Sequence, residues 1–162
     1  MPDRPSARRR DLQRRMKEAE ARICRNGKEF ERAIAEWRRA ATEDGLLAFI
    51  GQIIECYSRL VQNKPEDTGR ARAGWHIEGR ADEWKPAAGV YRDRIARLVA
   101  EQTAKLPALS ASDVIYIMNN VEYILPLEAG YSRRGAGFFA LFIAELKAQL
   151  EAAAARSRRG NA

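Results

Sequence analysis

The sequence predicts one domain that combines long helices with short strands. Its 162 residues are enough for one hydrophobic core, and 46% of them are hydrophobic against 31% that are charged, as is typical of a globular chain. Apolar residues recur at helical spacing in the first third and near the end of the chain, whereas two segments between them have the composition of strands. These observations together favour a mixed α and β fold.

The first predicted helix covers residues 7–25 and is polar almost all round. Its thin apolar stripe lies at helical spacing and consists of Leu12, Met16, Ala19 and Ile23. A stripe this narrow needs a partner surface to be stable. Asn26-Gly27 predicts the end of this helix, because both residues tolerate a left-handed backbone.

Residues 28–62 are predicted to be helical with an interruption. Two apolar series follow each other there, first Phe30, Ile34, Trp37 and Ala41, and then Leu46, Ile50, Ile53, Tyr57 and Leu60. The second series is out of phase with the continuation of the first, and Asp44-Gly45 lies at the shift. One unbroken helix and a break into two helices are both compatible with this pattern.

The helical region ends at Pro65, because a proline disfavours helix at the residue before it. Asp67-Thr68-Gly69 then supplies the hydrogen-bonding side chains and the backbone freedom of a turn. The next predicted elements are a strand at 70–80, a loop at 81–89 and a helix at 91–106 that stops at Pro107.

The clearest predicted strand is the segment 114–118, which is apolar at every position. We therefore expect it to be covered on both faces. The last predicted elements are a turn at Asn119-Asn120, an irregular loop or short helical turns at 122–137, and an amphipathic helix at 139–150 that fades into an Ala-rich basic tail.

The net charge of +7 is concentrated at the two ends of the chain. Residues 1–25 hold nine basic and four acidic side chains, residues 151–162 hold three Arg and one Glu, and the remainder is balanced. This distribution argues against a basic groove in the body of the domain, but it allows a basic end to contact an acidic partner. The candidate contacts with DNA or with an acidic protein are Arg8, Arg9, Arg10, Arg14 and Arg15.

The sequence contains no recognisable catalytic or metal-binding constellation. Cys24 and Cys56 stand far apart without a neighbouring histidine, so we expect two reduced thiols and no zinc site. His76 is the single histidine and is expected to be structural. Asp113, Glu122 and Glu128 lack the spacing of a metal site. We therefore expect no enzyme activity, no metal and no cofactor.

Two further features exclude other classes of protein. The segment Gly135-Ala136-Gly137 lacks the full glycine pattern of a phosphate-binding loop, and we expect it to start a helix. The longest apolar run covers only residues 138–144, against roughly 20 residues for a membrane span. We expect neither a membrane partner nor a secretory signal.

Three segments carry motifs whose order and separation are informative. Residues 64–75 have the sequence KPEDTGRARAGW, residues 114–123 have VIYIMNNVEY, and residues 127–132 have LEAGYS. They resemble the P-x-D-T-G-R-L-R-x-S-W, V-Y-I-x-N-N-x-x-Y and L-E-x-G-x-S stretches of a family of bacteriophage tail-component proteins. The resemblance extends over residues 46–150, and the ordered motifs are more specific together than any one of them alone.

The chain departs from the family pattern at three places. Ala71 stands where the family usually has Leu, Gly74 stands where it usually has Ser, and residues 133–137 lack the usual proline. The first departure is expected to loosen the packing at the turn. The last leaves the conformation of the loop open.

The resemblance implies a non-enzymatic, structural role in the virion of a long-tailed double-stranded DNA phage. Copies arranged in a ring would complete the tail or join head to tail at the neck, after assembly in the host cytoplasm. The implied partners are other copies of the chain and the neighbouring neck and tail proteins, which are a head-completion or stopper protein and a tail terminator or tube protein. DNA in the channel is a further possible partner for the N-terminal arm.

The resemblance also implies an α+β fold, with a small mostly antiparallel sheet flanked by long N-terminal helices, a crossover helix and a C-terminal helix. We divide the chain into a basic N-terminal helical arm at 1–27, a single α+β tail-component domain at 28–150 and a basic C-terminal tail at 151–162. The motif residues that the resemblance marks are Asp67, Thr68, Gly69, Arg70, Trp75, Tyr116, Asn119, Asn120, Tyr123, Glu128 and Gly130.

Alternatives remain open for these motif residues and for the function. We expect Arg70 to pair with a carboxylate and name Glu128 as its candidate partner. The motif residues can equally hold the fold without touching a partner. A small DNA-binding protein that uses the Arg-rich N-terminal arm is the alternative function.

Overall fold

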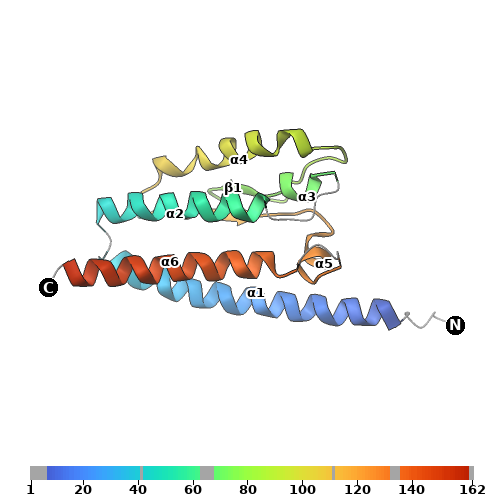
Figure 1. The fold of residues 1–162 in the computed structure, drawn as a ribbon, viewed down its shortest axis with the longest axis horizontal. Coiled ribbons are helices and arrows are strands. Elements are labelled where there is room, and N and C mark those ends of the chain that lie inside the picture. The colour runs from blue at the N-terminus through green and yellow to red at the C-terminus, as the bar shows by residue number, and fades with distance from the viewer. Residues whose placement is uncertain (1–6, 41, 63–67, 111, 132–135, 161–162) are drawn as a thin grey trace.

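The structure is a computed structural model that describes residues 7–40, 42–62, 68–110, 112–131 and 136–160. It consists mainly of helices and contains one two-stranded antiparallel sheet (Figure 1), in agreement with the mixed α and β fold that the sequence predicts. The elements, with 3₁₀ helices written η, are α1 (Ala7–Ala40), α2 (Glu43–Gln62), α3 (Arg70–Ala73), β1 (His76–Glu78), η1 (Arg92–Arg94), α4 (Ile95–Thr103), η2 (Leu106–Ala108), β2 (Tyr116–Met118), α5 (Ile124–Glu128) and α6 (Phe138–Gly160).

Helix α6 occupies the centre of the helical layers. It lies between α1 and α2, and α4 packs on another side of α2 and on β1 (Figure 1). Helices α1 and α6 run in the same direction, and α2 runs in the opposite direction. The largest fully buried side chains of the core come from α2, β1, η2 and α6 and from the loop after β2, and they are Tyr57, Ile77, Leu106, Leu150, Val61, Val121 and Cys56.

Helix α1 continues without a break past Asn26-Gly27, so the predicted end of the first helix is wrong. The Asn26 side-chain amide donates a hydrogen bond to the Ala140 carbonyl of α6 at 3.3 Å. The apolar stripe of α1 packs along α6 and α5, with Ala19 buried, and this packing outweighs the weak local tendency of Gly27 to end the helix. The thin stripe thus has the partner surface that its sequence requires.

The predicted interruption between two helices is confirmed, just before Asp44-Gly45. Helix α1 ends at Ala40 and α2 begins at Glu43. The Thr42 hydroxyl accepts a hydrogen bond from the Gly45 N–H at 3.1 Å, and the Thr42 carbonyl accepts one from the Leu46 N–H at 2.9 Å. This is the hydrogen-bonding pattern of an N-cap, which starts α2 after the chain has turned back.

The predicted strand at 70–80 is only partly correct. Its first residues form the short helix α3, and only His76–Glu78 form β1. Gly69 precedes α3 with a φ of 79°, and a Cβ at this position would lie 2.9 Å from the Arg92 backbone nitrogen. The close approach of the segment around Arg92 therefore requires a glycine here and turns the chain into α3.

The second strand is shorter and more exposed than the sequence predicts. Strand β2 pairs with β1 in antiparallel register, with Ile77 opposite Ile117. Val114 and Tyr116 keep 61% and 42% of their surface exposed, so the expected cover on both faces is wrong. The apolar composition of 114–118 reflects burial on one face and at one edge only.

The remaining predicted elements agree with the structure in kind. Residues 81–89 form neither helix nor strand, the helix predicted at 91–106 is η1 followed by α4, and α5 is the short helical turn expected within 122–137. Helix α6 extends beyond the predicted 139–150 to Gly160, so residues 151–160 of the basic tail are helical. Asp67 and the loop residues 132–135 lie outside the described residues.

Candidate assembly site

The first two motif segments are joined by the side chain of Asn119. Its amide donates to the Ala71 carbonyl at 2.8 Å, and its side-chain oxygen accepts from the Val121 N–H at 3.1 Å. A Cβ at Gly74 would lie 2.5 Å from this oxygen. The absence of a side chain at Gly74 therefore lets Asn119 approach the turn after α3.

Arg70 pairs with Glu122, and the expected pairing with Glu128 is wrong. An Arg70 guanidinium nitrogen lies 3.0 Å from the Glu122 carboxylate, and the Arg70 Nε donates to the Pro86 carbonyl at 2.9 Å. Lys85 contacts the same carboxylate at 2.6 Å. The guanidinium also lies 5.8 Å from the centre of the Tyr123 ring. Arg70 thus connects the segment after β2 to the loop at 81–89.

The charges around Glu122 have a clear electrostatic consequence. The hydrogen bond from Lys85, together with its own backbone N–H and the hydrogen bond from Arg70, lowers the pKa of Glu122 to about 2. The carboxylate is therefore ionised over the whole physiological pH range.

Glu128 has a different role from the one expected, because its carboxylate starts helix α6. It is buried, and its two oxygens accept hydrogen bonds from the Phe139 N–H at 2.9 Å and the Ala140 N–H at 3.1 Å. The Glu128 carbonyl also accepts from the Gly137 N–H at 2.9 Å. A carboxylate at this place satisfies two free N–H groups and complements the positive end of the helix dipole.

Gly130 ends α5 and connects it to α1. With a φ of 82° it takes the left-handed conformation of a helix C-terminus, where its N–H bonds to the Leu127 carbonyl and the next N–H bonds to the Pro126 carbonyl. Its own carbonyl accepts a hydrogen bond from the Arg15 guanidinium at 2.9 Å. The third motif thus joins α5, α6 and α1.

Trp75 and His76 lie inside the molecule behind this joint. Trp75 is buried with its ring 5.0 Å from that of Phe139, and its carbonyl accepts from the Tyr57 hydroxyl at 2.8 Å. His76 is buried too, with its Nδ1 2.9 Å from the Gly74 carbonyl and its Nε2 2.8 Å from the Asp82 carboxylate. Both ring nitrogens are therefore engaged in holding the fold.

The loop at 81–89 contributes residues that the sequence did not single out. Asp82 faces His76, whose hydrogen bond lowers the pKa of the Asp82 carboxyl. The Asn120 amide donates to the Asp82 carbonyl at 3.1 Å and to the Trp84 carbonyl at 2.9 Å. The Asp82 carboxylate also accepts a hydrogen bond from the Trp84 N–H at 3.0 Å, whereas the contacts with Asn120 join residues at least 36 positions apart.

The other motif residues divide between turn and surface. The Thr68 carbonyl accepts from the Tyr91 N–H at 2.6 Å, and its hydroxyl accepts from the Arg70 N–H at 3.3 Å. Tyr116 and Tyr123 are exposed. Two of the motif aromatic residues are thus free to contact a partner.

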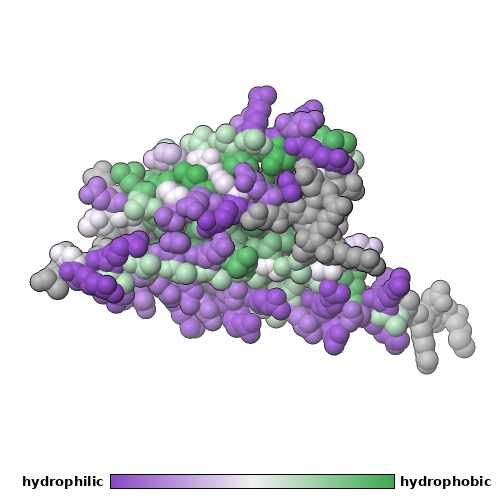
Figure 2. Space-filling view, viewed as in Figure 1, coloured by the Kyte–Doolittle hydropathy of each residue, from purple (hydrophilic) through white to green (hydrophobic). Residues whose placement is uncertain are grey.

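The N-terminal arginines do not act as one group. Arg8, Arg9 and Arg10 are exposed at the start of α1, and hydrophilic side chains cover the outer face of this helix (Figure 2). Arg14 pairs with Asp11 at 2.6 Å, whereas Arg15 is committed to Gly130. Four of the five candidates, Arg8, Arg9, Arg10 and Arg14, are therefore exposed, whereas Arg15 bonds to the rest of the fold.

The acidic candidates for a metal site are not brought together. Glu122 and Glu128 have the separate partners described above, and Asp113 accepts a hydrogen bond from the Ser110 N–H at 2.6 Å. The described part of the chain contains no group of three or more His, Cys, Asp and Glu side chains that could hold a metal ion. Within the same residues, no helix is long and apolar enough to cross a membrane.

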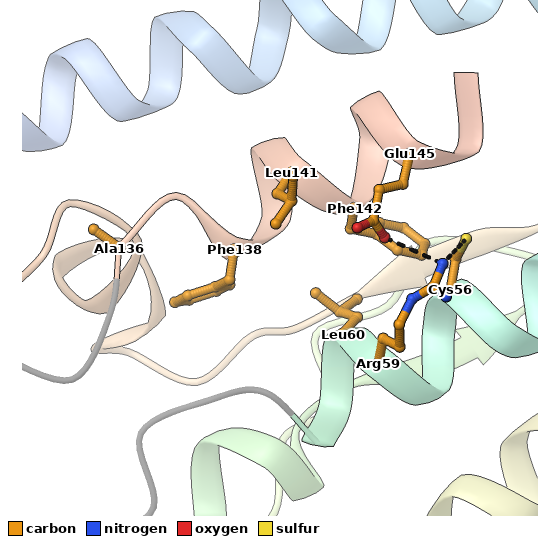
Figure 3. Close-up of a pocket in the computed structure, with 8 residues that line it drawn as sticks. All are labelled: Cys56, Arg59, Leu60, Ala136, Phe138, Leu141, Phe142 and Glu145. Atoms are coloured by element: carbon orange, nitrogen blue, oxygen red, sulfur yellow. Dashed lines mark hydrogen bonds and ion pairs between the residues drawn. The ribbon is translucent and has the colours of Figure 1, made fainter. Parts of the chain in front are cut away.

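A small pocket of about 160 Å³ lies between α2 and the beginning of α6 (Figure 3). Arg59 points across it, with one guanidinium nitrogen 3.4 Å from the Cys56 sulfur and 3.5 Å from the Glu145 carboxylate. Cys56 is fully buried, and burial raises the pKa of its thiol. A thiol in this state is a poor nucleophile, so the pocket has the character of packing rather than of a reactive site.

No family model, curated protein or solved structure matches the chain.

A double-mutant cycle tests the pairing of Arg70. Arg70→Ala and Glu122→Ala together are expected to lower the free energy of unfolding by less than the sum of the single changes, because both remove the same interaction. Urea denaturation of the four proteins gives the coupling. Arg70→Ala combined with Glu128→Ala is the matched control and should be additive. Coupling in the control pair, or additivity of Arg70 with Glu122, contradicts the assignment.

The depressed pKa of Glu122 predicts a specific loss of stability in acid. The folded pKa of about 2 lies below the ordinary value of 4.5, so the stabilisation by this group is complete above pH 4.5 and is lost as the pH falls toward 2. Urea midpoints measured between pH 5 and 2 should fall less steeply in Glu122→Gln than in the wild type. Equal slopes for the two proteins would show that the ion cluster does not form.

Proposed function

We propose that the protein is a structural component of a phage virion that completes the tail or joins head to tail at the neck, as one copy in a ring. One observation carries the proposal. The first two motif segments meet in one hydrogen-bonded joint, although Arg70 and Glu122 are 52 positions apart and Asn119 and Ala71 are 48 apart. The third segment follows the second directly, and its Leu127 N–H donates a hydrogen bond to the Tyr123 carbonyl at 3.1 Å. Contacts between the motif segments support a single resemblance over residues 46–150 rather than separate chance matches.

The surface of the molecule also suits assembly. A head-to-tail ring requires two different contact surfaces on each copy, and large exposed apolar side chains occur on several elements. They are Leu47, Trp84, Val90, Val114, Tyr116, Tyr123, Tyr131 and Leu141. Apolar groups of this size are covered by neighbours in many assemblies.

The contact with DNA is a second candidate, favoured by the position of the basic residues. Because α1 and α6 run in the same direction, the N-terminal arginines and the basic end of α6 lie at opposite ends of the molecule (Figure 1). One end of each copy could therefore face DNA in the channel while the other faces protein. Binding of this kind depends strongly on salt and little on sequence.

The proposal is tested in a lysogen that encodes the chain. Deleting the gene is expected to leave filled heads and tails that do not join, because the neck lacks one of its rings. Negative-stain electron microscopy of the lysate shows the unjoined particles, and an epitope tag places the protein in complemented virions. Normal virions from the deletion strain, or virions without tagged copies at the head–tail junction, contradict the proposal.

One protein with four substitutions distinguishes the DNA-binding alternative from the structural role in the neck. The substitutions are Arg8→Gln, Arg9→Gln, Arg10→Gln and Arg14→Gln. Arg15 is left unchanged because it bonds to Gly130. A structural neck protein should still join heads to tails with these changes. A DNA-binding protein with these changes should no longer shift the electrophoretic mobility of duplex DNA at moderate salt. Particle assembly should not depend on a protein of that kind.

A further inference from the structure

The two edges of the sheet are in different states. On the outer side of β1, the Ile77 N–H donates to the Gln102 side chain at 2.9 Å, and the Ile77 carbonyl accepts from the Lys105 ammonium at 2.8 Å. Both groups of Ile77 are thus turned away from β2 and satisfied by α4 and the residues that follow it. This edge is closed to a further strand.

The outer side of β2 is open. Ile117 stands opposite Ile77 in the antiparallel register. Opposite residues in such a ladder alternate between pairs that bond to each other and pairs whose N–H and carbonyl groups point outward. Because the groups of Ile77 bond on the outer side of β1, the N–H and carbonyl of Ile117 point away from β1. Ile115 lies one residue before β2, and in a strand continued to this residue its N–H and carbonyl would point the same way as those of Ile117. Within the described residues these four groups make no hydrogen bond, and β2 pairs with β1 alone. An edge in this state is a template for another strand.

An apolar groove runs beside this free edge. Its volume is about 540 Å³, and it lies between the β2 segment on one side and α1 on the other, with α2 and α6 beneath. Ile34, Phe49 and Ile50 are among its apolar lining residues. Its charged lining residues are Glu31, Arg38 and Asp113, and all three are exposed. The groove therefore suits a segment with an apolar centre and with charged residues of both signs near its ends.

We propose that this groove binds an extended segment of another protein, which adds to the free edge of β2 as a third strand. The backbone of the segment would bond to Ile115 and Ile117, and alternate side chains would enter the groove. The inference does not depend on the proposed function, because it rests on the sheet edge and the groove alone.

A second copy of the chain is the less suitable occupant. Its β1 edge is already bonded by Gln102 and Lys105, so it cannot pair with β2 in a head-to-tail manner. Its β2 would carry its own β1 on the far side, only about 4.8 Å beyond the added strand. Helix α1 lines the groove opposite β2, so this second β1 would have to fit between the added strand and α1.

The size of the contact determines how tightly a free segment binds. One short strand and a few apolar side chains bury far less than the roughly 1,200 Å² of a stable interface. An isolated peptide should therefore bind weakly, whereas a strand held nearby by a larger assembly would bind tightly through its high effective concentration.

The test uses a peptide of the chain's own residues 112–120 with a lysine added at each end as the probe strand. Hydrogen exchange of the labelled full-length protein is followed by NMR at millimolar peptide. The amides of Ile115 and Ile117 should exchange at least about tenfold more slowly, as expected for newly bonded N–H groups. A peptide that is N-methylated at alternate residues is the control and should give no protection.

Two substitutions of Ile115 distinguish hydrogen bonding by its backbone from contacts of its side chain. Ile115→Ala keeps the N–H and should keep the protection of Ile117, whereas Ile115→Pro removes a donor that β1 does not use and should abolish it. Four results overturn the proposal: no protection at millimolar peptide, peptide binding without protection, equal protection by the methylated peptide, or a sedimenting dimer of the chain that protects the same amides without peptide.

Discussion

The buried carboxylate of Glu128 is the interaction on which the arrangement of this protein depends. It accepts the Phe139 and Ala140 N–H groups and so determines where α6 begins relative to α5. Helix α6 lies between α1 and α2, so a shift of its first turn would displace the packing on both sides. The Glu128 carboxylate can be buried because the backbone N–H groups at the start of α6 replace the hydrogen bonds that water would make to it. Gly130 then bonds to Arg15 and ties the same corner to α1.

The sequence predicted the long helices because their apolar residues recur at helical spacing, and the break before α2 was visible as a change of phase. It did not predict the uninterrupted course of α1, because the contact between Asn26 and Ala140 joins residues 114 positions apart. Arg70 was expected to have a carboxylate partner, but spacing alone could not distinguish Glu122 from Glu128. The exposed face of β2 was missed, because an apolar run has the same composition whether one face of the strand or both faces are covered.

The residues of the three motif segments have two kinds of environment. Asn119, Glu122 and Glu128 hold segments of the chain to one another, whereas Tyr116, Tyr123 and the edge at Ile117 are available for contact. The body of the chain has a balanced charge and its two ends are basic, so attraction to an acidic partner would be confined to the two ends of each copy.

The most direct test of this account is the exchange rate of the Phe139 and Ala140 amides in Glu128→Gln. A glutamine has one acceptor oxygen where the glutamate has two, so at least one amide should lose its protection, and the free energy of unfolding should fall by about 2 kcal/mol. Glu145→Gln changes a more exposed carboxylate of α6, the helix that contains both amides; it is the control and should leave both amides protected. Unchanged exchange at Phe139 and Ala140 in Glu128→Gln would contradict the central role of this carboxylate.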